Sequence, residues 1–185
     1  MIKLDRNAVE NAALRPLIDE AEIVRFKKGE TVIKMGSICN YLFLIEQGML
    51  RNFYYDQKGK DITHWFSSEG MIVTSPPSFF KREPSFFEIQ ALEDTVVKAI
   101  SYIQFEQALE HSQALERFAR KLVTEVMITL GRKVIDLQTQ SAAHRYDALL
   151  ISHPDIFQRA NLGHIAGYLG ITQQTLSKIR ASKLG

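Results

Sequence analysis

The chain has 185 residues, of which 45% are apolar and 24% are charged, and these proportions are ordinary for a globular protein with a buried core. No apolar run approaches the roughly 20 residues that span a bilayer, and the start MIKLDRNAVE lacks the apolar centre of a signal peptide, so we expect a cytoplasmic protein. Cys39 is the only cysteine, which excludes an intramolecular disulfide and a zinc or iron–sulfur site built from cysteines.

The net charge of +2 conceals an uneven distribution along the chain. Residues 1–143 contain 18 Lys and Arg against 19 Asp and Glu, whereas residues 144–185 contain five against two, and no acidic residue follows Asp155. Basic charge concentrated at one end of a chain is typical of a surface that meets a polyanion. A short terminal segment can also be basic by chance, so charge alone leaves the partner open.

The first part of the chain predicts a short helix followed by many short strands. The helix has Asp5 as its capping candidate and apolar positions at Val9, Leu14, Leu17 and Ile18. From Ala21 to Ser101, short strand-like runs alternate with turns that contain Gly29, Gly36, Gly48, Gly59 and Gly70. Regular strands with glycine-containing turns predict an antiparallel sandwich or barrel.

One segment inside this strand region predicts a short helix instead. Ser75 precedes Pro76 and Pro77, which is typical of a helix N-terminus with proline in the first turn. Its free N–H groups, with the hydroxyls of Thr74 and Ser75, form a candidate site for a small anion. The nearby aromatic residues equally suit a filled barrel without a ligand, and Arg51 suits either the barrel interior or a solvated strand face.

A long helix follows the strands. Ser112 is its capping candidate, and apolar residues step by three or four along it at Leu115, Phe118, Leu122, Val126, Leu130, Val134 and Leu137. So long an apolar stripe favours pairing with a second copy of the chain, and a packing helix within a monomer is the alternative. The polar stretch Gln138–Arg145 marks the boundary with the basic C-terminal segment.

The C-terminal segment predicts two short helices around a glycine turn. The apolar face of the first helix contains Leu162, Ile165, Ala166 and Leu169. Gly170 makes the turn, and the apolar residue Ile171 follows it. Thr172 caps the second helix, in which Leu176 and Ile179 point inward. The outer face of the second helix keeps Gln173, Gln174, Ser177, Lys178 and Arg180. This arrangement is typical of a helix-turn-helix, in which Gln pairs with adenine and basic residues contact phosphate or guanine. An ordinary helical hairpin with a solvated basic face is the alternative.

Several quoted motifs resemble the Crp/Fnr superfamily of bacterial transcription regulators. GHIAGYLGITQQTLSKIR resembles its helix-turn-helix, and the ending ITQQTLSKIR is similar to a branch common in Bacteroidetes-type bacteria. FKKGETVIKMGSICNYLFLIEQGMLRNFYYDQKGKDI resembles the first half of the family's cyclic-nucleotide-binding-type jelly roll, and QALEDTVVKAISY resembles its last strands. ALERFARKLVTEVM resembles the start of the family's dimer helix, so the resemblance covers nearly the whole chain.

The resemblance implies an α+β fold in three parts: a jelly-roll sensor domain at 1–111, a dimerisation helix at 112–139 and a helix-turn-helix DNA-binding domain at 140–185. It implies a homodimer whose dimer interface contains Leu115, Phe118, Leu122, Val126, Leu130 and Val134, and it makes double-stranded DNA a partner and RNA polymerase a further candidate. The residues expected to contact DNA are Thr172, Gln173, Gln174, Thr175, Ser177, Lys178, Arg180 and Lys183. Among them, Gln173, Gln174 and Lys178 fall where the superfamily reads bases, and Thr172 and Thr175 where hydroxyls hold phosphates.

The expected effector pocket departs from the family pattern. The superfamily binds a cyclic nucleotide through a Gly-Glu pair and an Arg-Ser or Arg-Thr pair, and this chain has Thr74-Ser75 and Ser85-Phe86 at those positions. Because both charges are missing, we expect no cyclic AMP, no fixed cofactor and at most an unidentified small effector. The candidate pocket residues are Arg51, Thr74, Ser75, Ser85 and Phe86.

Other function classes fit the sequence less well. A jelly-roll enzyme needs clustered metal ligands, and the barrel region contains only His64, so we expect neither an enzyme nor a metal site. The remaining alternative is a ligand-binding or interaction module whose C-terminal hairpin docks a protein. Many superfamily members continue into a β-wing, whereas this sequence ends at Gly185, so we expect the phosphate contacts of a wing to be missing.

Overall fold

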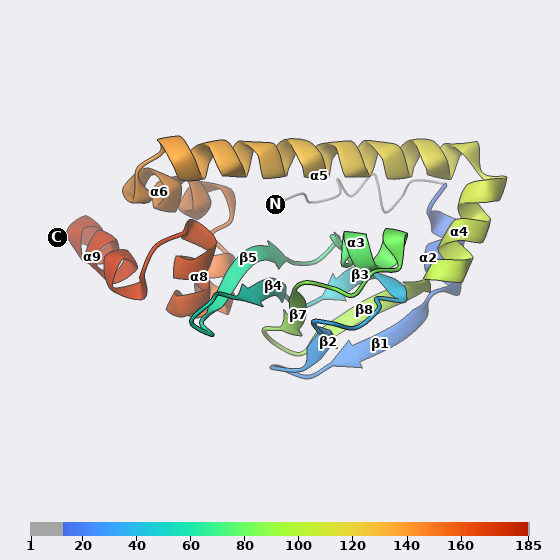
Figure 1. The fold of residues 1–185 in the computed structure, drawn as a ribbon, viewed down its shortest axis with the longest axis horizontal. Helices are drawn as coiled ribbons and strands as arrows, with labels where there is room; N and C mark the ends of the chain where they lie inside the picture. The colour runs from blue at the N-terminus through green and yellow to red at the C-terminus, as the bar shows by residue number, and fades with distance from the viewer. Residues whose placement is uncertain (1–12, 185) are drawn as a thin grey trace.

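The computed structural model describes residues 13–184 and consists of a β-barrel, a long helix above it and a group of short helices at one end (Figure 1). Helix α2 (Arg15–Glu20) follows Leu14, has Pro16 in its first turn, and buries Leu17 and Ile18 as predicted. Asp5 and Val9, which were expected in the same helix, lie outside the described residues.

The barrel is a jelly roll of two four-stranded antiparallel sheets, with strand orders β1-β8-β3-β6 and β2-β7-β4-β5. This confirms the predicted antiparallel β region. The strands are β1 (Glu22–Phe26), β2 (Thr31–Ile33), β3 (Tyr41–Gln47), β4 (Leu50–Tyr55), β5 (Asp61–Ser67), β6 (Ile72–Val73), β7 (Glu88–Ala91) and β8 (Thr95–Ser101). Apolar side chains from both sheets fill the space between them, including the fully buried Ile45, Leu50, Ile89 and Val97.

The turn between β3 and β4 packs closely against the start of β8. Gly48 has a φ of +104°, and a Cβ atom there would lie 2.4 Å from the hydroxyl oxygen of Thr95. Only glycine therefore suits this position, both for its backbone conformation and for the space available.

Three helices follow or interrupt the strands. Helix α3 (Pro76–Lys81) begins after Ser75, as predicted, and helix α4 (Tyr102–His111) begins with a capping box formed by Ser101 and Gln104. Helix α5 (Gln113–Thr139) is capped by the predicted Ser112, whose hydroxyl accepts a hydrogen bond from the N–H of Leu115. It runs past the barrel and ends beside the C-terminal helices (Figure 1).

The C-terminal helices share an apolar cluster with the barrel. They are α6 (Ala142–Ser152), α7 (Ile156–Arg159), α8 (Leu162–Leu169) and α9 (Gln173–Leu184). Their buried residues Ile156, Ile165 and Leu176 belong to the same cluster as Met49 and Phe66 of the barrel. The helices are therefore packed against the barrel and are not a freely hanging unit.

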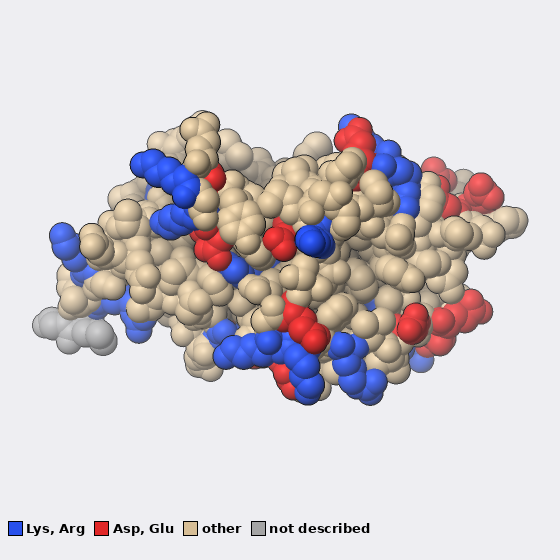
Figure 2. Space-filling model, turned by 60° about the horizontal axis from the view of Figure 1, so that its bottom comes forward, with Lys and Arg blue, Asp and Glu red and all other residues tan. Residues whose placement is uncertain are grey.

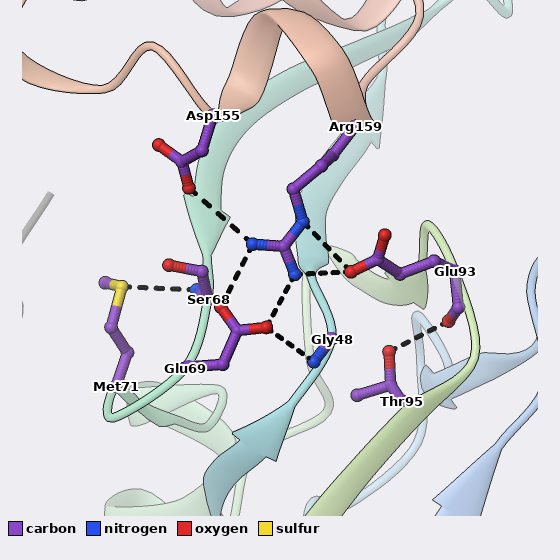
Figure 3. Close-up of polar contacts among 8 residues, drawn as sticks. All are labelled: Gly48, Ser68, Glu69, Met71, Glu93, Thr95, Asp155 and Arg159. Carbon is purple, nitrogen blue, oxygen red and sulfur yellow. Dashed lines mark hydrogen bonds and ion pairs between the residues drawn. The ribbon is translucent and has the colours of Figure 1, made fainter.

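Arg159 joins α7 to the nearest end of the barrel (Figure 3). Its guanidinium donates to Glu69 at 2.7 and 3.0 Å and to Glu93 at 3.0 Å, and it lies 3.6 Å from the Asp155 carboxylate. Glu69 also accepts the N–H of Gly48 at 2.8 Å. Burial would raise the pKa of Glu69, but the hydrogen bonds from Arg159 and Gly48 outweigh it and lower the pKa to about 2. One cation thus links the turns after β3, β5 and β7 to the helices.

Helix α8 lies directly on strand β5. A Cβ atom at Gly167 would be 3.0 Å from the backbone nitrogen of Thr63 and 3.6 Å from Cα of Ile62. A larger residue would push the helix and the strand apart, so Gly167 permits this close approach.

Replacing Arg159 with Gln should lower the free energy of unfolding by about 1–3 kcal/mol at pH 7, because Glu69 and Glu93 would lose their shared cation. The pKa of Glu69 is lowered from 4.5 to about 2, so this stabilisation is complete above pH 4.5 and is lost as the pH falls toward 2. Urea denaturation of wild type and variant at pH 7 and pH 3.5 measures both effects. Arg15→Gln, which breaks the exposed Arg15–Asp19 pair, is the control and should change stability little. Equal losses for the two variants would contradict the role of Arg159.

Candidate nucleic-acid interface

Helices α8 and α9 form the predicted pair around a glycine turn. Asn161 caps α8 by accepting the N–H of His164 at 2.8 Å, and Gly170 ends it with a φ of +67°. The hydroxyl of Thr172 accepts the N–H of Thr175 at 3.1 Å, so Thr172 caps α9 as predicted. These local signals place α9 at a defined angle to α8.

The inner and outer faces of the two helices agree with the predicted pattern. Ile165, Ala166, Leu169 and Leu176 are buried, and Leu162, Ile171 and Ile179 are partly buried against them. From the turn to the middle of the following helix, the exposed residues are Thr172, Gln173, Gln174, Ser177 and Lys178. Hydrogen-bonding groups of both kinds and one cation are therefore gathered at the solvent face of the first half of α9.

Three other residues expected at DNA are differently engaged. Lys183 forms an ion pair with Asp147 of α6 and lies 5.8 Å from the centre of the Tyr146 ring. The Thr175 hydroxyl lies 2.9 Å from that of Thr172, and Arg180 is half-buried. Lys183 stays a candidate phosphate contact, but Asp147 offsets its charge within the same group of helices.

On the face shown in Figure 2, the end formed by α9 carries Lys and Arg without Asp or Glu. Asp and Glu gather at the opposite end, and charges of both signs lie along the middle. The basic end coincides with the segment that has no acidic residue after Asp155. Positive potential is thus concentrated where the exposed face of α9 lies.

Helix α5 presents an apolar stripe to solvent, but its position differs from the predicted one. Leu115 is fully buried in the barrel core and Phe118 packs against that core, so Leu115 is unavailable to a second chain. Leu122 and Val126 are half-buried. Five of the exposed apolar residues step by four and three, as in a heptad repeat, and are Val123, Met127, Leu130, Val134 and Leu137; Ile128 and Ile135 are exposed beside them. The first turns of α5 pack against the barrel through Leu115 and Phe118, and the exposed apolar stripe begins after them at Val123.

Three of the five residues of the expected effector pocket lie together, and their hydroxyls bond within the protein. Ser75 and Ser85 are fully buried and their hydroxyls hydrogen bond to each other at 2.9 Å, while the Thr74 hydroxyl donates to the carbonyl of Tyr41 at 3.1 Å. Ser75 begins α3 without a side-chain cap, because its hydroxyl accepts from Ser85 instead. The hydroxyls of Thr74, Ser75 and Ser85 thus make hydrogen bonds within the fold, which favours the alternative of a filled barrel.

Arg51 and Phe86 lie apart from these hydroxyls. Arg51 is buried, donates to Asp61 at 2.8 Å and to Gln90 at 3.0 Å, and its charge lies 4.0 Å from the centre of the Phe53 ring. Phe86 is 62% exposed. Of the two alternatives for Arg51, its burial therefore excludes the solvated strand face.

Sequence reasoning missed Arg159 and Gly167, which hold the helices on the barrel, and the buried His164 in the same contact. Arg159 was counted only as one of the C-terminal charges, and its carboxylate partners are 66 and 90 residues away. A glycine inside an apolar helix face was an available signal of close packing. No comparable signal marks His164.

The described residues 13–184 contain neither a candidate metal centre nor a candidate membrane span. There, no three His, Cys, Asp or Glu side chains are grouped so that they could hold a metal ion. None of the helices in this range combines the length and apolar character needed to cross a membrane.

Comparison with known proteins finds a family model that matches the barrel and relatives that align with most of the chain. Residues 23–112 match the cyclic nucleotide-binding domain family. Electron transport regulator A of Shewanella oneidensis is 22% identical over 184 residues, an alignment that covers 94% of this chain and 72% of that protein. The chain spans 62–72% of the length of the curated relatives it matches.

Two solved structures share the fold. FixK2 from Bradyrhizobium japonicum superimposes with a TM-score of 0.74 at 18% identity, covering 88% of this chain and 83% of that structure. A transcriptional regulator of the Crp/Fnr family from Eubacterium rectale gives a TM-score of 0.74 at 19% identity, covering 94% and 84%. Residues 23–112 therefore match the cyclic nucleotide-binding domain family, and the chain shares its fold with these two proteins.

Proposed function

We propose that the protein is a homodimeric transcription regulator that binds specific sequences in double-stranded DNA and responds to a small effector other than cyclic AMP. The observation that carries this proposal is the exposed face of α9, which combines Gln173, Gln174, Ser177 and Lys178. These side chains lie at the basic end of the molecule. No Asp or Glu side chain occurs between residues 156 and 185 that would repel a phosphate backbone.

The residue types on this face fit the major groove. A glutamine amide both donates and accepts, so it pairs with the N6 and N7 atoms of adenine through two hydrogen bonds. Gln173 and Gln174 lead the helix, and the N-terminal residues of a recognition helix are those that reach base edges. Lys178 lies about one turn later and suits a guanine or a phosphate.

The stripe on α5 supports pairing with a second copy of the chain. Five large apolar side chains at heptad spacing stand open to solvent, and a parallel helix from a second copy would cover them. Each dimer would then present two α9 helices. Two such helices enter successive major grooves about 34 Å apart, which requires an inverted repeat in the DNA.

The effector proposal follows from the chemistry of the barrel. The positions that hold a cyclic nucleotide in the superfamily lack the arginine and the glutamate here, and the nearby hydroxyls bond to other protein groups. A cyclic phosphate would meet no opposite charge at that place, so desolvating it would be uncompensated.

Gln173→Ala should weaken binding to the preferred duplex by roughly 1–3 kcal/mol and relax the base preference at one position of each half-site. Selection of bound sites from random duplexes, followed by fluorescence anisotropy, measures both effects. Gln113→Ala, at the exposed start of α5, is the matched control and should leave affinity and preference unchanged. Selection that returns no inverted repeat would contradict the proposal.

Lys178→Ala should weaken binding and reduce the slope of log affinity against log salt concentration by about 1, because one phosphate neutralisation is lost. Lys183→Ala should reduce the slope less, since Asp147 already pairs with this lysine. The slopes come from anisotropy titrations between about 50 and 200 mM salt. Binding that does not depend on salt would favour the alternative in which the helical hairpin docks a protein.

Met127→Lys combined with Val134→Lys should convert the dimer to a monomer, because it places charges in the middle of the exposed stripe. Sedimentation velocity measures the change, and Glu125→Lys, on the opposite face of the same helix, should remain dimeric. A double variant that sediments like the wild type would place the interface elsewhere.

Isothermal titration calorimetry of the purified protein should detect no binding of cyclic AMP or cyclic GMP at micromolar concentration. Saturable binding in that range would show that the barrel holds a phosphate without the arginine and glutamate of the family pattern.

A further inference from the structure

The contact between α8 and β5 contains a histidine whose ring is shielded from water. His164 lies on the α8 turn before Gly167, the residue that lets this helix approach the backbone of Thr63. The Nδ1 atom of His164 is buried and has no hydrogen-bond partner among residues 13–184. The charged groups that face the ring are Arg51 from β4 and Asp61 from β5.

The hydrogen bonds of His164 require its neutral form. The Asn161 side-chain oxygen accepts the backbone N–H of His164 at 2.8 Å, so the amide nitrogen of Asn161 is the atom that faces the ring. That nitrogen can only donate, and it lies 3.1 Å from Nε2 of His164, which must therefore accept. In a protonated ring Nε2 carries a hydrogen, and two donors would then face each other.

Burial and the nearest cation both disfavour a charged ring. Arg51 is buried and donates to Asp61 at 2.8 Å, so its guanidinium is held in place beside the seam between strand and helix. Burial first, and then the positive charge of Arg51, lower the pKa of His164 from 6.5 to about 4, although the carboxylate of Asp61 opposes this shift. A second positive charge on the imidazole is thus disfavoured as long as α8 covers it.

We propose that the seam between β5 and α8 is a proton-operated latch, in which neutral His164 lets α8 lie on the barrel and protonated His164 releases it. Helix α9 follows α8 after a short turn, so release would free the recognition helix from its fixed position relative to α5. The latch concerns docking within one chain, and it stands or falls independently of whether α9 binds DNA.

The sign and range of the effect follow from proton linkage. The docked form holds its proton less tightly than the released form, whose histidine has its ordinary pKa of 6.5, so docking is strongest above pH 6.5 and weakens as the pH falls toward 4. Within that window the docking equilibrium changes by up to about tenfold per pH unit, and by about 30-fold between pH 7.5 and pH 5.0.

A second buried histidine, His64, lies on the barrel side of the seam. The effect of its protonation has to be distinguished from that of His164. Burial and the nearby Lys133 lower the pKa of His64 to about 4, and Lys133 donates to the His64 carbonyl at 2.5 Å. The His64 ring packs against Phe87 and Tyr54 of the barrel, with its centre 5.0 Å from that of Phe87. Its protonation would therefore act on the barrel itself, whereas His164 sits on the helix that moves.

Hydrogen–deuterium exchange of the full chain at pH 7.5 and 5.0 tests the latch, with rates corrected for the intrinsic effect of pH. In the wild type, the amides of β5 and α8 should exchange about 30-fold faster at pH 5.0, while far-UV circular dichroism stays unchanged. His164→Gln keeps an acceptor for Asn161 but cannot be charged, so the corrected exchange rates of α8 should lose this change with pH. His144→Gln removes an exposed histidine from α6 and should respond like the wild type, as should His64→Gln.

Two outcomes would overturn the proposal: a wild type that shows no faster exchange at pH 5.0, or His164→Gln that responds as strongly as the wild type. If the α8 amides of His164→Gln already exchange fast at pH 7.5, the same exchange measurement on Asp61→Asn tests the latch. That variant leaves Arg51 without its carboxylate beside the ring, so release should occur at a higher pH than in the wild type. An unchanged or lower release pH would contradict the latch.

Discussion

The guanidinium of Arg159 is the interaction on which the arrangement of the two halves depends. It binds carboxylates from two turns of the barrel, and one of these, Glu69, also holds the backbone of a third turn at Gly48. Charge-assisted hydrogen bonds of this kind are directional, so they fix the orientation of α7 as well as its distance from the barrel. The apolar residues around Met49 and Phe66 supply most of the buried area, but apolar contact alone tolerates sliding. Arg159 therefore determines the register in which the helices dock.

The C-terminal helices contact the end of the barrel and not its interior. The interior is filled by residues such as Leu50 and Ile89, and the hydroxyls near α3 bond to one another. Strand β5 has contacts with both regions, because its backbone meets α8 at Thr63 and Phe66 joins the shared apolar cluster. A change in the barrel could reach α9 by shifting β5 by a fraction of an ångström, since close-packed contacts transmit displacement.

The sequence was most informative where the signal is local. Thr172, Gly170 and Ser112 each act within a few residues of their own position, so capping and turn preferences were enough to place α8, α9 and the start of α5. It was least informative where a side chain meets a distant partner. Arg51 pairs with Asp61 across a strand pair, Lys183 meets Asp147 from 36 residues away, and Leu115 turns toward the barrel although it continues the apolar spacing of α5. Spacing gives the face of a helix, but only the packed fold decides which of two neighbours covers it.

The heptad spacing on α5 has a geometric consequence for the proposed dimer. From Val123 to Leu137 the stripe spans two heptads, and on a straight helix a seven-residue repeat drifts by about 20° per heptad. Two copies that keep this stripe in contact must therefore wind around each other with a left-handed twist. The winding rotates each subunit about the common axis before its helix-turn-helix begins. The rotation of each α5 about the common axis thus sets the angle between the two copies of α9 in the proposed dimer. A residue inserted into or deleted from α5 would change that angle and leave the exposed face of α9 unchanged.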